Sequence, residues 1–169
     1  MAPREQHPPG QSGSSVREFF QHDHVEIDAL FAAVRREIRV CAEANKPASS
    51  TIVSQFEEFD RRLEKHIHWE EDLLFPEVER VSPELRDGPG DDMRREHQDI
   101  RRFKDAARKE LERAMADPQA LPRSAEALDR MREILEVHNM KEEQVYYPMA
   151  DEMLAPALAS DLLKKVRTF

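Results

Sequence analysis

The sequence has few of the residues that build sheets or disulfide frameworks. It holds 169 residues, of which 4 are glycine and one is cysteine, and 7% are aromatic. The single cysteine, Cys41, cannot form a disulfide within the chain, which fits a reducing compartment, and we interpret it as a small buried side chain. Because charged residues reach 36%, this composition disfavours a sandwich or barrel and favours long amphipathic helices.

An excess of basic residues and long apolar runs are also absent. The formal net charge is −9 and the sequence pI is about 5.3, so attraction to nucleic acid phosphates or anionic lipid is disfavoured. No apolar stretch approaches the roughly 20 residues that a membrane span needs, and residues 1–15 lack the apolar stretch of a secretory signal. We therefore expect a cytoplasmic protein with no nucleic-acid partner and no membrane partner.

The length is that of one domain, and the chain divides into an arm and a folded part. Residues 1–13 are rich in proline, glycine and glutamine without periodicity, which predicts a disordered N-terminal arm. Residues 14–169 are predicted to form one helical domain.

Capping and breaking residues divide that domain into helices. The expected signals are a capping box from Ser15 to Glu18 and an end near Asn45 to Pro47 for the first helix, and an N-cap within 49–51 and an end near Val81 for the second. A breaker loop over 82–90, a stop at Asp117 and Pro118, a start at Pro122 and a short helix after Pro156 complete the set. Helices of about 25 to 30 residues joined by short loops must fold back on one another. The predicted fold is all-α, an antiparallel up-down-up-down four-helix bundle with a short C-terminal helix.

Apolar residues in each helix alternate at spacings of four and three, which predicts an inward seam. The expected seam residues are Phe20, Ile27, Phe31, Val34, Ile38 and Cys41; Ile52, Phe56, Phe59, Leu63 and Leu73; Met93, Ile100, Phe103, Ala107 and Leu111; and Leu128, Met131, Leu135, Val145 and Met149.

Six polar residues occupy slots of these seams. They are His24 in the first helix, His66 and Glu70 in the second, His97 in the third, and His138 and Glu142 in the fourth. Burying such groups without partners would cost several kcal/mol each, a large part of the roughly 5–15 kcal/mol that stabilises a domain. A pair of metal ions offsets this cost, because carboxylate and neutral imidazole are their usual ligands. The other histidines, at positions 7, 22 and 68, are expected in solvent.

An internal repeat indicates where the six residues meet. The segments HIHWEEDLLFP from His66 and HNMKEEQVYYP from His138 share glutamates at four and five residues on, an aromatic at nine and a proline at ten. His24 and His97 each have isoleucine three residues later. The chain is thus interpreted as two similar helical hairpins whose histidines lie at one level of the bundle. Two histidines would bind each ion, and Glu70 and Glu142 would bridge ions roughly 3.5–4 Å apart, leaving room for a bridging oxygen and a small exogenous molecule.

Several alternatives stay open at this point. A polar core layer held by hydrogen bonds without metal is the competing interpretation of the six residues. Pro76 and Pro148 either end or bend their helices. Tyr146 is a core residue or a donor close to the site, and Arg101 neutralises a carboxylate near the site or points to solvent.

These residues resemble the hemerythrin-like, or HHE cation-binding, family over about residues 15 to 150. The resemblance rests on His24 with Ile27 and Asp28, on His97 with Ile100, and on the two repeated segments. It implies two iron ions with an oxo or hydroxo bridge, terminal ligands His24, His66, His97 and His138, and bridging ligands Glu70 and Glu142. It also implies a protein that binds or senses dioxygen or nitric oxide. The alternatives are a di-iron enzyme that reduces or dismutates peroxide or nitric oxide, and an iron-handling or stress-response protein.

The sequence departs from the oxygen-carrying members at two places. Their third helix has HxxxH, whereas Arg101 stands four residues after His97, so one histidine ligand is missing. Their fourth helix has HxxxxD, whereas Glu142 and Glu143 follow His138, and the repeat favours Glu142 as the ligand. An additional open position favours redox or sensing chemistry over oxygen storage. Manganese or zinc would suit the same ligand types.

Overall fold

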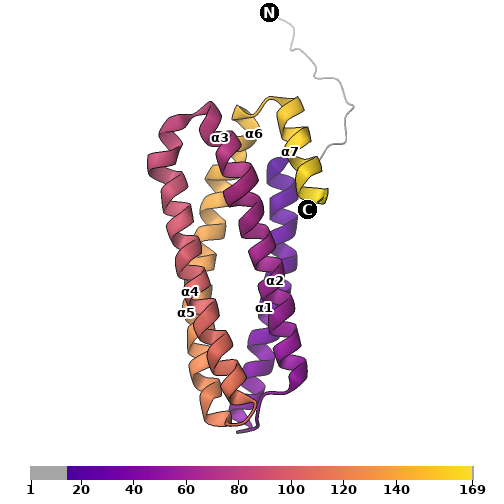
Figure 1. Cartoon of the computed structure of the whole chain (residues 1–169), viewed down its shortest axis with the longest axis vertical. Coiled ribbons are helices and arrows are strands. Elements are labelled where there is room, and N and C mark those ends of the chain that lie inside the picture. The colour runs from indigo at the N-terminus through magenta and orange to yellow at the C-terminus, as the bar shows by residue number, and fades with distance from the viewer. Residues whose placement is uncertain (1–14, 169) are drawn as a thin grey trace, which may run out of the picture.

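Four long helical segments run antiparallel, and a short fifth helix packs at one end (Figure 1). We describe residues 15–168 from a computed structural model of the chain. The segments are, in chain order, α1 (Val16–Glu43); α2 (Ser50–Trp69) continued by η1 (Glu70–Leu74) and α3 (Phe75–Val81); α4 (Asp91–Ala114); α5 (Leu121–Lys141) continued by η5 (Glu142–Tyr146) and α6 (Tyr147–Met153); and α7 (Pro156–Thr168). The short turns η2 (Pro83–Leu85) and η3 (Arg86–Gly90) join α3 to α4, and η4 (Pro118–Ala120) lies between α4 and α5. The predicted helical bundle with a C-terminal helix is confirmed, whereas the predicted arm lies outside the described residues.

Capping side chains fix the starts of the first two segments. The Oγ of Ser15 accepts from Glu18 N at 3.0 Å, and Ser15 N donates to Glu18 Oε2 at 3.2 Å, so the predicted capping box is present. Ser49 caps α2 by accepting from Ile52 N at 3.3 Å. Each cap satisfies backbone donors that have no partner within the helix.

Two π-helical turns lie inside the second and fourth segments, at η1 and η5. Each comes just before a proline, Pro76 or Pro148, and Phe75 N bonds back five residues to Glu70 O, as Tyr147 N does to Glu142 O. A proline lacks an N–H and its ring clashes with the carbonyl four residues earlier, so a wider turn before it relieves the clash. The prolines therefore do not end these segments but widen them beside the polar layer.

The π turns explain why two predicted seams are wrong after Glu70 and Glu142. One added residue rotates the following side chains by about 100°, which moves the seam on by one position. Val145 is 60% exposed, and Leu73 and Met149 are only half-buried. The buried residues instead are Leu74, Phe75, Val78, Tyr146, Tyr147 and Ala150.

Before the π turns the seam prediction is accurate, with two small exceptions. Phe103 and Cys41 are half-buried rather than buried, and Lys104 takes a buried place beside Phe103. The other expected seam residues of α1, α2, α4 and α5 are buried.

The core consists of two apolar clusters. One lies toward the α1–α2 and α4–α5 turns and includes Phe31, Phe56 and Leu128. The other lies toward α7 and includes Phe20, Phe75 and Tyr147. Polar residues that are buried between the two clusters form the layer described below.

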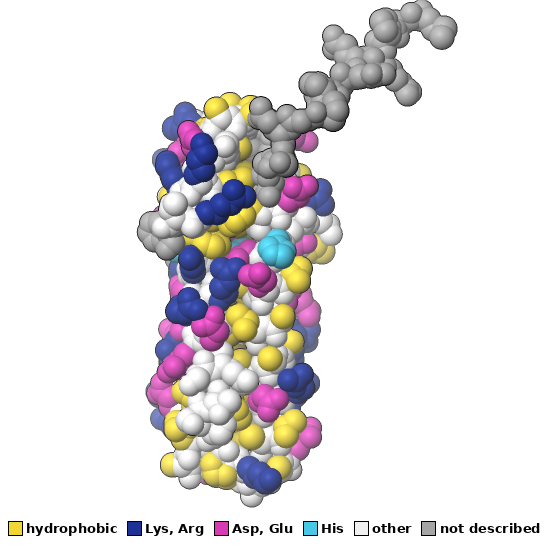
Figure 2. All heavy atoms as spheres, turned by 90° about the vertical axis from the view of Figure 1, so that its right-hand side faces the viewer, with side chains coloured by type: hydrophobic (Ala, Val, Ile, Leu, Met, Phe, Trp, Pro, Cys, Tyr) yellow, Lys and Arg dark blue, Asp and Glu magenta, His cyan; other side chains and the backbone are white. Residues whose placement is uncertain are grey.

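The surface mixes charges of both signs. On the face shown in Figure 2, acidic and basic side chains are interspersed along the bundle. Among residues 15–168, no helix has the length and apolar character that crossing a membrane requires.

Candidate metal centre

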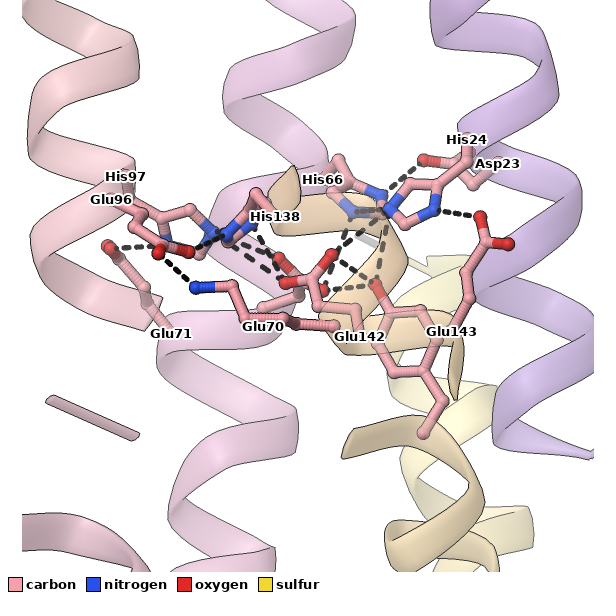
Figure 3. A network of polar contacts seen from close by, with 12 residues as sticks. Asp23, His24, His66, Glu70, Glu71, Glu96, His97, His138, Glu142 and Glu143 are labelled. Atoms are coloured by element: carbon pink, nitrogen blue, oxygen red, sulfur yellow. Dashed lines mark hydrogen bonds and ion pairs between the residues drawn. The ribbon is translucent and has the colours of Figure 1, made fainter. Parts of the chain in front are cut away.

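The six polar seam residues converge in one layer of the bundle. Figure 3 shows His97 and His138 on one side, His24 and His66 on the other, and Glu70 and Glu142 between them. Each side chain is at most 4% exposed. They come from α1, α2, η1, α4, α5 and η5, so all four segments contribute. The common level expected from the repeat is therefore observed.

The imidazoles form two pairs that point toward the centre. The Nε2 atoms of His24 and His66 are 3.0 Å apart, and those of His97 and His138 are 2.9 Å apart. Two ligand atoms about 2.1 Å from one metal ion and at right angles to each other would be about 3 Å apart. The spacing of each pair is thus that of two ligands on a shared ion.

Each carboxylate has one oxygen toward each histidine pair. Glu70 Oε1 lies 3.5 Å from His66 Nε2, and its Oε2 lies 3.2 Å from His97 Nε2. Glu142 Oε2 lies 3.3 Å from His24 Nε2, and its Oε1 lies 2.9 Å from His138 Nε2. A carboxylate placed in this way is suited to bridge two ions.

The fit to a metal pair rests on two further observations. The residues form two overlapping buried groups that share Glu70 and Glu142, and the potential ligand atoms of each group lie within 4.8 Å of one another. Within the described part of the chain, the buried oxygens Glu70 Oε2 and Glu142 Oε1 have no well-directed hydrogen bond. Such atoms are costly unless another partner satisfies them. The arrangement is consistent with a binuclear metal site built from nitrogen and oxygen donors.

A second set of carboxylates holds the outer nitrogens of the imidazoles. The Nδ1 atoms of the four histidines contact carboxylate oxygens at 2.8–2.9 Å, in the pairs His24–Glu143, His66–Asp23, His97–Glu71 and His138–Glu96. A carboxylate at Nδ1 fixes the ring orientation and leaves Nε2 free to bind a metal. All four imidazoles are therefore oriented for coordination through Nε2.

Cations support three of these outer carboxylates. Asp23 pairs with Arg62, Glu96 with Lys141, and Glu71 with Arg101, whose Nη1 lies 3.2 Å from Glu71 Oε2. Arg101 thus neutralises a carboxylate near the site, which was one of its two predicted roles. Glu143 instead accepts a hydrogen bond from the neutral Gln21 at 3.3 Å.

The pKa values of the buried groups indicate a strongly coupled charge cluster. Burial lowers the pKa of His66, but the carboxylates of Glu70 and Asp23 outweigh it and raise the pKa to about 10. The pKa of His138 rises to about 10 for the same reasons, with Glu142 and Glu96 as the carboxylates. Despite burial, the neighbouring imidazoles hold the pKa of Glu70 well below its usual range. Without metal, protons on the imidazoles compensate the glutamates.

Tyr147 adds a hydroxyl to the centre that the sequence analysis did not assign. Its Oη donates to Glu70 Oε1 and lies 3.1 Å from Glu142 Oε2 and 3.3 Å from His24 Nε2. Burial and the two carboxylates raise its pKa well above the usual value, so the phenol stays protonated. Of the two roles expected for Tyr146, a core residue or a donor close to the site, burial in the apolar cluster toward α7 confirms the first. Tyr147 is the donor instead, because the π turn at η5 moves the inward position on by one residue.

We predict that removal of the hydroxyl destabilises the protein at Tyr147 but not at the adjacent Tyr146. Tyr147→Phe removes the hydroxyl that donates to Glu70 and contacts Glu142, and should lower the free energy of unfolding of the metal-free protein by about 1–3 kcal/mol. Tyr146→Phe is the matched control, because the Tyr146 hydroxyl is buried and has no hydrogen-bond partner among residues 15–168. Its removal should change stability by less than about 0.5 kcal/mol or increase it. Urea unfolding of both variants tests this, and equal losses would contradict the assigned role of Tyr147.

Four further carboxylates of the site, which the seams do not predict, carry a signal in the repeat. Asp23 and Glu96 each precede the first histidine of a hairpin, and Glu71 and Glu143 each follow the inward glutamate. The first two bond to the second histidine of their own hairpin, and the last two bond to the first histidine of the other hairpin. Of the remaining histidines, His22 is exposed, as expected, and His68 is half-buried and pairs with Asp72, while His7 lies outside the described residues.

Comparison with known proteins agrees with this site. No curated protein sequence gives a significant match to the chain, and neither does any solved structure. Residues 15–150, which carry all six central residues, match the hemerythrin HHE cation binding domain. With that match over most of its length, the chain belongs to the hemerythrin HHE cation-binding domain family.

Proposed function

We propose that the chain holds two iron ions through His24, His66, His97, His138, Glu70 and Glu142, and that the pair binds dioxygen or nitric oxide reversibly. The observation that carries the proposal is a cavity directly beside the four histidines, with a volume of about 10 Å³. A cavity of this size accommodates about one water molecule. A cavity of this volume suits a diatomic ligand better than an organic substrate.

The cavity wall favours binding over catalysis. Apart from the histidines, its lining consists of aliphatic side chains and one amide, namely Ile27, Leu63, Ile67, Ile100, Leu135 and Asn139. None of these six can deliver or accept a proton, which the reduction of peroxide would require near the bound ligand. Tyr147 can donate a proton, but it is not among the residues that line the cavity. A reversible adduct is thus supported better than turnover.

The choice of iron rests on donor chemistry together with the family. Imidazole with carboxylate suits iron, manganese or zinc, and geometry rather than affinity selects among them. Two imidazoles for each ion, with Glu70 and Glu142 shared between the ions, would leave positions free for an added ligand, as a binding site for a gas needs.

Ligand binding should be visible directly. The iron-loaded, reduced protein is expected to form a spectroscopically distinct adduct when mixed with nitric oxide in a stopped-flow instrument, and its peroxide turnover should not exceed that of free iron. Metal analysis of protein from its native source should give about two iron ions per chain. The absence of any adduct with nitric oxide or dioxygen, with iron bound, would refute the proposed function.

A further inference from the structure

The internal repeat makes two helix interfaces comparable residue by residue. When His24 is aligned with His97 and His66 with His138, α1 corresponds to α4 and α2 corresponds to α5. The α1–α5 interface is therefore the counterpart of the α2–α4 interface. Both flank the cavity beside the histidines, so a difference between them bears on how a ligand reaches the metals.

Ion pairs close the α2–α4 interface. Arg101 lies 3.1 Å from Glu64 and 3.2 Å from Glu71. Lys104, which is 4% exposed, lies 2.6 Å from Asp60 and also pairs with Glu64. This network covers the outer side of the histidine layer between α2 and α4.

The α1–α5 interface lacks the counterparts of these cations. Asp28 stands at the position of Arg101, and Phe31 stands at that of Lys104. A groove of about 430 Å³ lies here, lined by Asp28, Phe31, Glu136 and Glu143, among others. Arg35 pairs with Asp129 across this interface one turn beyond Phe31, but among the residues described no such pair covers the level of Asp28, where the groove lies.

Two residues line both the groove and the cavity. They are Leu135, which is 6% exposed, and the half-buried Asn139. Asn139 lies one helical turn before Glu143, which contacts His24 on α1. The counterpart of Asn139 in the repeat is Ile67, which is 1% exposed and lines the cavity but not the groove. The one amide in the cavity wall thus stands where the cavity adjoins the groove.

We propose that small ligands reach the metal pair through the α1–α5 groove, and that Asn139 controls their passage and is the polar group they meet at the cavity. This inference rests on the proposed function, since it assigns a route to the same ligands. The charges of the groove indicate which ligands pass. Arg35 pairs with Asp129, and Arg132 pairs with Glu136, so Asp28 and Glu143 leave the groove acidic. Uncharged ligands are favoured over anions.

Substitutions of Asn139 test the route. Asn139→Ile copies the closed side and should slow the association of nitric oxide with the reduced protein about tenfold, whereas Asn139→Ala should accelerate it by a similar factor. Val137→Ile and Val137→Ala are matched controls, because Val137 is 50% exposed on the same helix and lines neither space. Metal content should be equal in all variants. Wild-type association rates in both Asn139 variants would overturn the inference.

A second variant closes the groove from the opposite helix. Asp28→Arg introduces on α1 the counterpart of Arg101, and the new arginine should pair with Glu143. Both association and dissociation of nitric oxide should then slow about tenfold, with little change in affinity. Asp28→Asn keeps the size of the side chain and should leave both rates within about twofold. Unchanged rates in Asp28→Arg would count against the route.

Azide separates failure of the inference from failure of the proposed function. It binds oxidised metal centres whatever the physiological ligand is. If the wild-type protein binds azide but no gas, the proposed function is wrong. Azide is an anion and should enter the acidic groove more slowly than a gas, but its association rates in the Asn139 variants relative to the wild-type protein still test the route in the same direction.

Discussion

Replacing Glu70 and Glu142 together by glutamine is expected to abolish the binding of the metal pair, from about two ions per chain to less than about 0.2. Each carboxylate has one oxygen toward each pair of histidines, so both ions lose two anionic ligands at once. Glutamine preserves the shape of the side chain but supplies no charge to offset that of the ions. Elemental analysis after metal loading and desalting measures the effect.

The same variant should lose the stabilisation that the metals give. With free metal at 100 times Kd, each site adds about 2.7 kcal/mol, so two sites add about 5 kcal/mol. For a chain of this size, that corresponds to a rise in Tm of about 10–20 °C in the wild-type protein and none in the variant.

A double substitution in the same two helical segments provides the control. Glu57→Gln with Glu133→Gln removes two charges from exposed positions of α2 and α5. This variant should bind metal and gain Tm as the wild-type protein does. Full metal binding by the Glu70→Gln, Glu142→Gln variant would show that these two glutamates are not ligands. Failure of the wild-type protein to bind metal would show that the six residues form a hydrogen-bonded polar layer and not a metal site.

The sequence was sufficient to place the central residues because their positions follow from helical periodicity alone. A spacing of four and three puts His24, His66, Glu70, His138 and Glu142 inward, and burial of at most 4% confirms it. The spacing of the seams predicts which side chains point inward as long as each residue adds the same rotation about the helix axis. That condition holds up to the two inward glutamates.

Beyond the glutamates periodicity fails, for a local reason. The π turns before Pro76 and Pro148 each change the rotation by about one residue. Tyr147 therefore reaches the site in place of Tyr146, and Val145 faces solvent. The two prolines are visible in the sequence. The direction of the side chains that follow them depends on which backbone hydrogen bonds are formed in the turn, and the sequence pattern does not contain this information.

The outer carboxylates could not be assigned for a different reason. A contact such as Glu143 with His24 joins residues 119 positions apart and depends on how α1 and α5 are rotated against each other. Single-helix patterns do not contain that rotation. Each hairpin has an acidic residue just before its first histidine and another just after its inward glutamate. These residues indicate the outer contacts only when the two hairpins are compared.

Because protons on the imidazoles compensate the buried glutamates, the stability of the metal-free protein should depend on pH. The pKa values of His66 and His138, about 10, lie above the 6.5 of an exposed histidine. A group whose pKa is raised by folding contributes stability that is complete below pH 6.5 and lost as the pH rises through 10. We therefore expect the metal-free protein to lose on the order of a few kcal/mol per histidine between pH 7 and pH 10.

Bound metals should reverse this dependence. Coordination through Nε2 requires neutral imidazole, so each ion displaces a proton that the metal-free site holds at pH 8. We expect at least about two protons to be released when the pair of ions binds at pH 8, and metal affinity to rise with pH until His66 and His138 deprotonate near pH 10. Calorimetric titration in buffers of different ionisation enthalpy counts these protons. Release of less than about one proton would mean that the imidazoles are already neutral in the metal-free protein, and that the glutamates are compensated in another way.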